Sequence, residues 1–270
     1  GYESALALAD LGADVVLLCR SLERGEAAAE QIREQTGNAR VSVEELDISR
    51  LASVQSAAAR LGEGTVDVLI HNAGALPDER IETEDGLELT LATHVVGPHL
   101  LTRLLRPALE QSSDARVIWV SSGGMYTRRL NVRDPNWEER EYDGVVAYAE
   151  TKRAQVVLAE LWAEDLRGTS VVVNSMHPGW ADTPSVETSL PNFYRLTRHV
   201  LRTAAEGADT VVWLAASPRA SQWTRCFFFD RAIRRTCLLP FTRESDEERS
   251  QLWKMCEETS AASSTSDGEQ

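Results

Sequence analysis

The sequence has 270 residues, of which 43% are hydrophobic, and its 42 Asp and Glu against 28 Lys and Arg give a net charge of −14. This length and composition suit one α/β domain with a full core, and the acidic balance argues against binding to nucleic acid or anionic membranes. No apolar run approaches the roughly 20 residues that span a bilayer. The four cysteines form no metal-binding pair, so we expect no metal and a reducing, cytoplasmic compartment.

The first half of the chain predicts alternating helices and strands. Residues 4–11 favour a helix that stops at Gly12, and the apolar run 13–19 favours a strand buried on both faces of a parallel sheet. Ser21 and Ser49 are expected to cap the helices that follow them. The remaining predicted elements are a helix to about residue 36, strands over 41–46 and 65–71, and a long helix over 85–111 with a kink near Gly97 and Pro98.

The second half continues the alternation. It predicts strands over 117–121, 170–175 and 225–229, a helix that carries Tyr148 and Lys152, an excursion with short helices over 183–202, and a helix over 204–216. This order predicts one Rossmann-like domain over residues 1–243, a doubly wound parallel α/β sheet. Residues 244–270 are expected to form an acidic helix and a disordered tail rich in Ser, Thr and Glu.

Polar or small residues follow five of the predicted strands. In a parallel sheet, ligands bind outside the carboxyl ends of the strands, so together these residues predict a ligand groove. They are Arg20, Asp47-Ile48, Asn72-Ala73-Gly74, Ser121-Ser122, and His177-Pro178-Gly179 with Thr183.

Tyr148 and Lys152 are four residues apart and therefore share one face of a helix. A lysine ammonium near a phenol favours the phenolate and lowers its pKa, which makes tyrosine usable as a general acid or base. On its own such a pair is most often an exposed aromatic ring beside a solvated amine. The surrounding motifs must decide between the two interpretations.

Those motifs resemble the short-chain dehydrogenase/reductase family over about residues 1–230. The resemblance rests on Asn72-Ala73-Gly74, Ser122, Tyr148 with Lys152, and Pro178-Gly179, in this order and spacing. It implies that Tyr148 exchanges a proton with the substrate oxygen, that Lys152 lowers the tyrosine pKa and binds the nicotinamide ribose, and that Ser122 polarises the substrate. Ser121 is the structural alternative that finishes the strand.

The resemblance also implies a nicotinamide cofactor bound by Arg20, Asp47, Ile48, Asn72, Ala73, Gly74, Tyr148, Lys152, Pro178, Gly179 and Thr183. An acidic residue after the strand that ends at Cys19 would favour NAD. Arg20 stands there, with Arg24 one turn on, and arginine can pair with a 2′-phosphate, so we predict NADP rather than NAD. The alternative is that Arg20 ends a solvated turn.

Two departures from the family pattern stand out. The family has a strand and a glycine-rich phosphate loop before its first helix, and here Gly1 aligns with the last glycine of that loop, so we expect the sheet to lack its first strand. His94 stands where the family has asparagine in the long helix. One interpretation of His94 is drift in a helix whose backbone matters, and the other is an altered proton relay, since histidine can shuttle protons.

The sequence thus predicts an NADP-dependent oxidoreductase that moves a hydride between nicotinamide and a carbonyl or secondary alcohol. The alternative is a truncated, cofactor-deficient or non-catalytic scaffold member of the same fold. A small-molecule substrate is expected, with no nucleic acid and no membrane segment, and the long helices are compatible with a homodimer.

Overall fold

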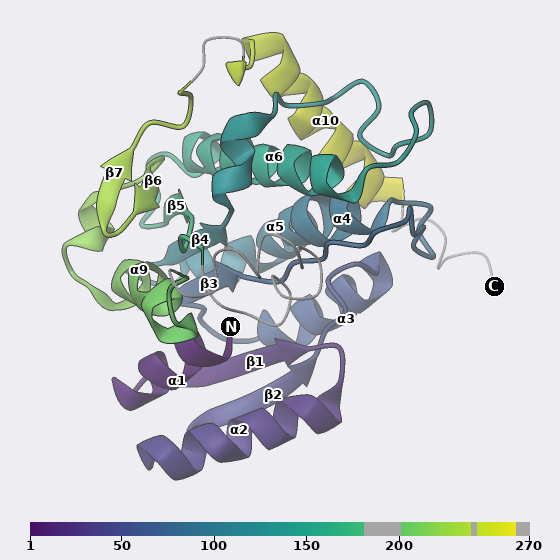
Figure 1. Cartoon of the computed structure of the whole chain (residues 1–270). Coiled ribbons are helices and arrows are strands. Elements are labelled where there is room, and N and C mark those ends of the chain that lie inside the picture. Colours follow the sequence, from purple (N-terminus) through teal and green to yellow (C-terminus); the bar gives the residue numbers. More distant parts are fainter. Residues whose placement is uncertain (181–200, 239–241, 263–270) are drawn as a thin grey trace.

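The computed structural model describes residues 1–180, 201–238 and 242–262, which form helices packed on both faces of a mainly parallel sheet (Figure 1). The α-helices are α1 (Tyr2–Asp10), α2 (Leu22–Thr36), α3 (Leu51–Leu61), α4 (Leu89–Leu91), α5 (Gly97–Glu110), α6 (Gly144–Asp165), α9 (Ala204–Ala216) and α10 (Asp246–Ala262). The strands are β1 (Val15–Cys19), β2 (Val41–Glu45), β3 (Val68–His71), β4 (Arg116–Val120), β5 (Val172–Met176), β6 (Phe227–Phe229) and β7 (Ala232–Arg234). The α/β class and the mainly parallel, Rossmann-like sheet predicted from the sequence are confirmed.

The sheet consists of two hydrogen-bonded parts. β1 pairs with β2 in parallel, and β3 to β6 form a second parallel array that ends in the antiparallel β7. In the described part of the chain no strand is hydrogen-bonded between β1 and β3. The strand predicted over residues 13–19 is present as β1, but it is not buried as expected, since Val16 is 43% exposed.

The β6–β7 hairpin is missing from the sequence prediction. Its two-residue turn, Asp230-Arg231, has φ of 53° and 55°. Positive φ at both positions is the geometry of a type I′ turn, which matches the twist of paired strands. Neither residue is glycine or asparagine, so the sequence carries no strong hairpin signal.

The main core lies where α3, α5, α6 and α10 cover the sheet, around fully buried β4. Leu252 and Cys256 of α10 belong to it, so the C-terminal helix is part of the packed structure. On the other face α9 packs over Ile118 and Met176. Buried Arg116 fastens α9 to β4 by donating to the last carbonyls of that helix.

Two local predictions need correction. The helix expected from residue 85 begins at Leu89, and a π-helical segment, η1 (Ala92–Val96), interrupts it before the expected kink at Gly97 and Pro98. Pro98 is the second residue of α5. Ser49 does not cap α3: the Asp85 carboxylate accepts from the Leu51 N–H, while Ser49 donates to Asp47.

Ser21 does cap α2, by accepting from the Arg24 N–H, and Gly12 follows α1 with a φ of 87°. Within the described residues, no helix combines the length and the apolar character needed to cross a membrane. The predicted excursion over residues 183–202 and the predicted tail lie largely outside the described residues.

Candidate active site

Helix α6 presents Tyr148 and Lys152 at the carboxyl end of β4. The Asp143 carboxylate caps the helix by accepting from the Val146 N–H at 3.0 Å. Gly144 lies so close to the loop after β3 that a Cβ there would meet the Pro77 carbonyl oxygen at 2.1 Å. This close approach fixes the start of α6, and hence the tyrosine one turn later.

Lys152 is buried, with 3% of its surface exposed. Its Nζ donates to the Val120 carbonyl at 3.0 Å and to Gln155 Oε1 at 3.0 Å, and it lies 5.4 Å from the centroid of the Tyr148 ring. Burial disfavours the ammonium and lowers the pKa of Lys152 to about 7. The lysine is thus poised between its charged and neutral forms near neutrality.

Tyr148 is half-buried, and burial raises the pKa of its phenol, while a hydrogen bond with Ser122 lowers it in part. The sequence predicts a pKa lowered by Lys152. The structure corrects this, because the ammonium is held by Val120 and Gln155 and burial dominates. A neutral tyrosine in this position is a proton donor.

The two serines after β4 have different partners. Ser121 is buried and donates to the Lys152 carbonyl at 2.8 Å, so it ties the strand to α6. Ser122 begins the short 3₁₀ segment η2 (Gly123–Thr127) and is hydrogen-bonded to Tyr148. The structure therefore brings Ser122, rather than Ser121, together with Tyr148.

His94 lies in η1 with a fully buried side chain that contacts the Tyr148 ring edge-on. Its Nε2 accepts from the Ala75 N–H at 3.0 Å, and its Nδ1 lies 2.8 Å from the Thr151 hydroxyl. Because that hydroxyl donates to the carbonyls of Ala147 and Tyr148, its oxygen accepts from Nδ1–H. His94 is thus a neutral ring with both nitrogens engaged, which favours a structural link over a proton relay.

The turn after β3 forms the opposite wall of the site. Asn72, Ala73 and Gly74 are all exposed. A Cβ on Gly74 would lie 3.3 Å from His94 Nε2 and 3.9 Å from Lys152 Nζ, so the backbone of this turn closely approaches both side chains. Gly1, before α1, lies against the Asn72 side chain.

The other predicted cofactor residues lie at the ends of β1, β2 and β5. Arg20 and Arg24 are exposed and form no ion pair with a carboxylate of the described residues. Asp47 accepts from Ser49. Its neighbour Ile48 packs on the start of α5, and Thr183 lies outside the described residues.

The loop after β5 is braced by a stack of side chains. The His177 ring stacks on the Phe229 ring with 4.2 Å between the centroids, and it accepts a hydrogen bond from the Gly179 N–H. The Arg202 guanidinium lies over the Phe229 ring, 4.8 Å from its centroid. Arg202 also pairs with Asp230. The sequence gives no signal for this brace, since its members come from three distant segments.

Gln155 is the other residue that sequence reasoning misses. It contacts Lys152 directly, and its position three residues further along the helix is the only signal that could have revealed it.

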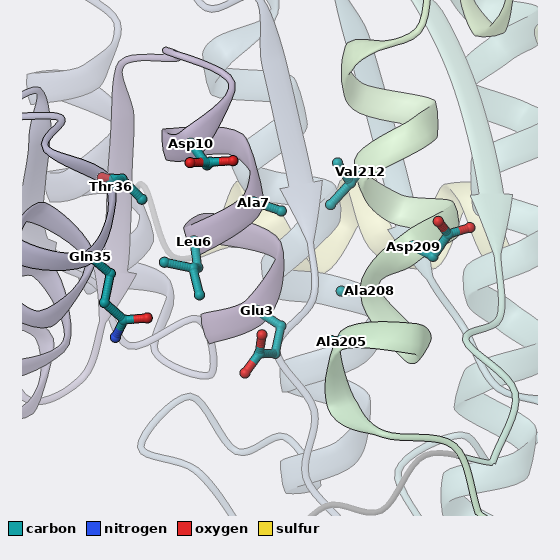
Figure 2. A pocket seen from close by; sticks show the side chains of 10 residues that line it. All are labelled: Glu3, Leu6, Ala7, Asp10, Gln35, Thr36, Ala205, Ala208, Asp209 and Val212. Atoms are coloured by element: carbon teal, nitrogen blue, oxygen red, sulfur yellow. The ribbon is translucent and has the colours of Figure 1, made fainter.

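Two of the cavities on the described surface help to locate the site. One of about 450 Å³ lies between α1, α2 and α9 and is lined by Leu6, Ala7 and Val212 with three carboxylates, and Figure 2 shows α1 and α9 on its two sides. None of its lining residues follows a strand or belongs to α6. The other, of about 480 Å³, is lined by residues 76–78 and 141–145 at the start of α6, next to the Tyr148 turn.

The residues around Lys152 and at the start of α1 show how well the site suits a nicotinamide cofactor. The exposed Asn72–Gly74 turn passes close to His94 and Lys152, so a flat, hydrogen-bonding group that packs on the turn would lie near Tyr148 and Lys152. On the phosphate side, the N-terminus of α1 at Gly1 lies against Asn72, where backbone N–H groups favour an anion. The residues present fit such a cofactor best at its nicotinamide end.

A parallel α/β sheet that gathers serine, tyrosine and lysine at its strand ends defines a class of nucleotide-dependent oxidoreductases. The family model for short chain dehydrogenase matches residues 1–192. The chain belongs to the short-chain dehydrogenase family and is an NAD(P)-dependent oxidoreductase. The family resemblance predicted from the sequence is confirmed.

Similar proteins support the same assignment. The chain is 42% identical to dehydrogenase/reductase SDR family member 12 of Bos taurus over 261 residues, which is 96% of this chain and 82% of that protein. It is 38% identical to human retinol dehydrogenase 13 over 185 residues, 68% of this chain and 56% of that protein. A crystal structure of a protein from Mycobacterium Paratuberculosis superposes with a TM-score of 0.77 at 27% identity, covering 97% of this chain and 89% of the other.

Buried histidines give a pH-dependent stability that can be measured. Burial lowers the pKa of His71 to about 3 and of His99 and His177 to about 4, and it places that of His94 well below 6.5. Below pH 6.5 the unfolded chain therefore binds more protons than the folded one, and stability falls as the pH falls from 6.5 towards 4. Each histidine contributes a slope of up to about 1.4 kcal/mol per pH unit.

Urea unfolding at pH 7.5, 6.5 and 5.5 checks this expectation. The free energy of unfolding should fall moderately between the first two values, where Lys152 also takes up a proton more readily in the unfolded chain, and more steeply between the last two. His71→Asn should reduce the slope of the free energy of unfolding against pH by up to about 1.4 kcal/mol per pH unit, the contribution of one proton. A free energy of unfolding that stays constant down to pH 5.5 would contradict the burial of these rings.

Proposed function

We propose that this chain uses NADP to interconvert a carbonyl compound and an alcohol, with Ser122, Tyr148 and Lys152 as the catalytic residues. The observation that carries the proposal is the cluster itself: a phenol hydrogen-bonded to Ser122, with a buried lysine 5.4 Å from its ring. When bound, the nicotinamide supplies or accepts the hydride. Every proton and hydrogen bond at the substrate oxygen comes from the chain.

The roles follow from the geometry. Tyr148, kept neutral by burial, donates its proton to the carbonyl oxygen during reduction, and Ser122 donates a hydrogen bond to the same oxygen. Lys152 stabilises the phenolate that results, because a positive charge beside a phenolate favours it. In the opposite direction the same phenolate accepts the proton of the alcohol.

Cofactor contacts are assigned along the strand ends. Asn72, Ala73 and Gly74 would pack on the adenine-side ribose, and Asp47 and Ile48 would lie beside the adenine. Lys152 would bind the nicotinamide ribose. Pro178, Gly179 and Thr183 would hold the nicotinamide amide.

The preference for NADP rests on Arg20 and Arg24. Both are exposed at the end of β1, and no carboxylate of the described residues pairs with either, so both remain able to bind a 2′-phosphate. Arg20→Ala should weaken NADPH binding by about 10–100-fold, the range for a lost charge-assisted hydrogen bond, and leave NADH binding unchanged.

Fluorescence titration of the 270-residue chain with NADPH and NADH tests this preference. Arg60→Ala, which removes an arginine paired with Glu44 on the surface, serves as the matched control. An equal loss of affinity for both cofactors, or no loss, would contradict the assignment of Arg20.

A second candidate is a family member that binds no cofactor and acts as a scaffold. The separation of β1 from β3 favours it, because this gap lies beside the N-terminus of α1, where the phosphates would bind. The same titration decides between the two: micromolar binding of NADPH supports the enzyme, and no binding at millimolar concentration supports the scaffold.

The substrate class is proposed from the cavity at the start of α6 and from the relatives. Because one relative is named retinol dehydrogenase 13, a substrate panel should include retinaldehyde beside smaller aldehydes and ketones. We further propose a cytoplasmic, reducing location, a homodimer, and a catalytic domain over residues 1–243 that α10 stabilises.

A further inference from the structure

Gln155 lies on α6 one turn after Lys152, and its side chain is fully buried. Its Oε1 accepts from Lys152 Nζ at 3.0 Å, opposite the Val120 carbonyl, which accepts at the same distance. Two neutral oxygens, one from the helix and one from β4, therefore hold the buried ammonium between them.

The orientation of the Gln155 amide is set by the lysine. Its Nε2 is buried and has no hydrogen-bond partner among the described residues. Leaving a buried N–H unpaired is unfavourable, so a glutamine would ordinarily turn to avoid it. An ammonium has donors only, and turning the amide would place donor against donor.

The surroundings of Lys152 contain no carboxylate ion pair within the described residues. The titratable groups that face it are Tyr148 on its own helix and His94 on η1, and both are neutral in the states described above. From β4 it meets the Val120 carbonyl, and Ser121 donates to its own backbone carbonyl. The charge of Lys152 thus depends on neutral acceptors.

We propose that Gln155 is a positioning residue that holds the Lys152 ammonium at the end of β4 and favours its protonated form. The inference rests on the proposed function of Lys152 in proton transfer. Burial already brings the pKa of Lys152 to about 7, so losing one acceptor would leave the lysine mostly neutral under ordinary conditions. A neutral lysine would no longer stabilise the Tyr148 phenolate.

The sequence makes the test unusually direct, because its only lysines are Lys152 and Lys254. Lys254 is exposed on α10, and its side chain retains 74% of its accessible surface. A chain labelled with ¹³Cε-lysine should give two NMR signals, which Lys254→Arg assigns. Titration then reads the pKa of Lys152 directly, with the signal of the exposed Lys254 as an internal reference.

Two substitutions should move that pKa in opposite directions. Gln155→Leu removes the acceptor at similar volume and should lower the pKa of Lys152 by about one unit, whereas Gln155→Glu places an opposite charge beside it and should raise it by about 1–3 units. The pH profile of turnover should shift with each. A merely structural glutamine would change stability without opposite shifts.

An unchanged Lys152 pKa in Gln155→Leu would overturn the proposal. If Gln155→Glu does not fold, Gln155→Asn withdraws the oxygen by one methylene and should also lower the pKa, and a pKa that stays unchanged would again overturn it. The NMR measurement needs no turnover. If the variants shift the Lys152 pKa but the chain has no activity, the proposed function is contradicted and the role of Gln155 is not. If the chain is active but the Lys152 pKa does not shift, the role of Gln155 is contradicted and the proposed function is not.

Discussion

Tyr148→Phe is expected to lower turnover by about 10²–10⁴-fold, the contribution of a positioned general acid. The change removes one hydroxyl, and the ring keeps its edge-on contact with His94, so the fold and NADPH affinity should be preserved. Steady-state kinetics and fluorescence titration measure the two properties separately. The loss should appear in kcat and not in cofactor binding.

Tyr126→Phe is a matched control, because it removes the hydroxyl of another tyrosine, within η2, that donates to the Arg235 carbonyl. It should retain most of the activity. If Tyr148→Phe kept wild-type turnover, the proton would have to come from another group, and the assignment of the site would be wrong.

Glu244→Leu is expected to destabilise the fold by about 3–5 kcal/mol. Glu244 pairs with Arg153, which directly follows Lys152 on α6, and the two side chains are 7% and 1% exposed. Arg153 also donates to the Thr236 carbonyl. Removing the carboxylate leaves the Arg153 guanidinium as an uncompensated charge in the core, between α6 and the segment that leads into α10.

Urea unfolding of three variants separates the charge from the packing. Arg153→Met combined with Glu244→Leu should recover most of the lost free energy of unfolding, since an apolar pair of similar volume avoids the stranded charge. Glu84→Ala removes an exposed partner of Arg50 and should cost at most about 1 kcal/mol. A single Glu244→Leu variant as stable as the wild type would show that the pair is solvated.

The sequence predicts the fold class and most elements because regular alternation and family motifs are local signals. Helix α9 begins and ends at the predicted residues, and Ser21 caps α2 as expected. The sequence does not reveal the π-helical segment that carries His94, because the i to i+5 hydrogen bonds of a π-helix leave no pattern in the residue types. Nor does it reveal Asp85 as the cap of α3, since that contact joins residues 34 positions apart.

The candidate site likewise has features that the sequence predicts and features that depend on tertiary packing. The spacing of Tyr148 and Lys152 on one helical face is readable from the chain, and so is their closeness to Ser122 once a parallel sheet is assumed. The direction of the Tyr148 pKa shift is not, because it depends on how deeply the phenol is buried and on which groups hold Lys152. The Arg202 brace on Phe229 likewise depends on tertiary packing.

Hydride transfer itself is the most direct test of the central claim. The 270-residue chain is incubated with NADPH that carries deuterium at both C4 positions of the nicotinamide and with a panel of aldehydes and ketones that includes retinaldehyde, and the products are analysed by mass spectrometry. We expect at least one alcohol product that carries a single deuterium on its carbinol carbon and is absent with Tyr148→Phe. Saturable NADPH binding with no deuterium in any product across the panel would contradict the claim that this chain is a working oxidoreductase.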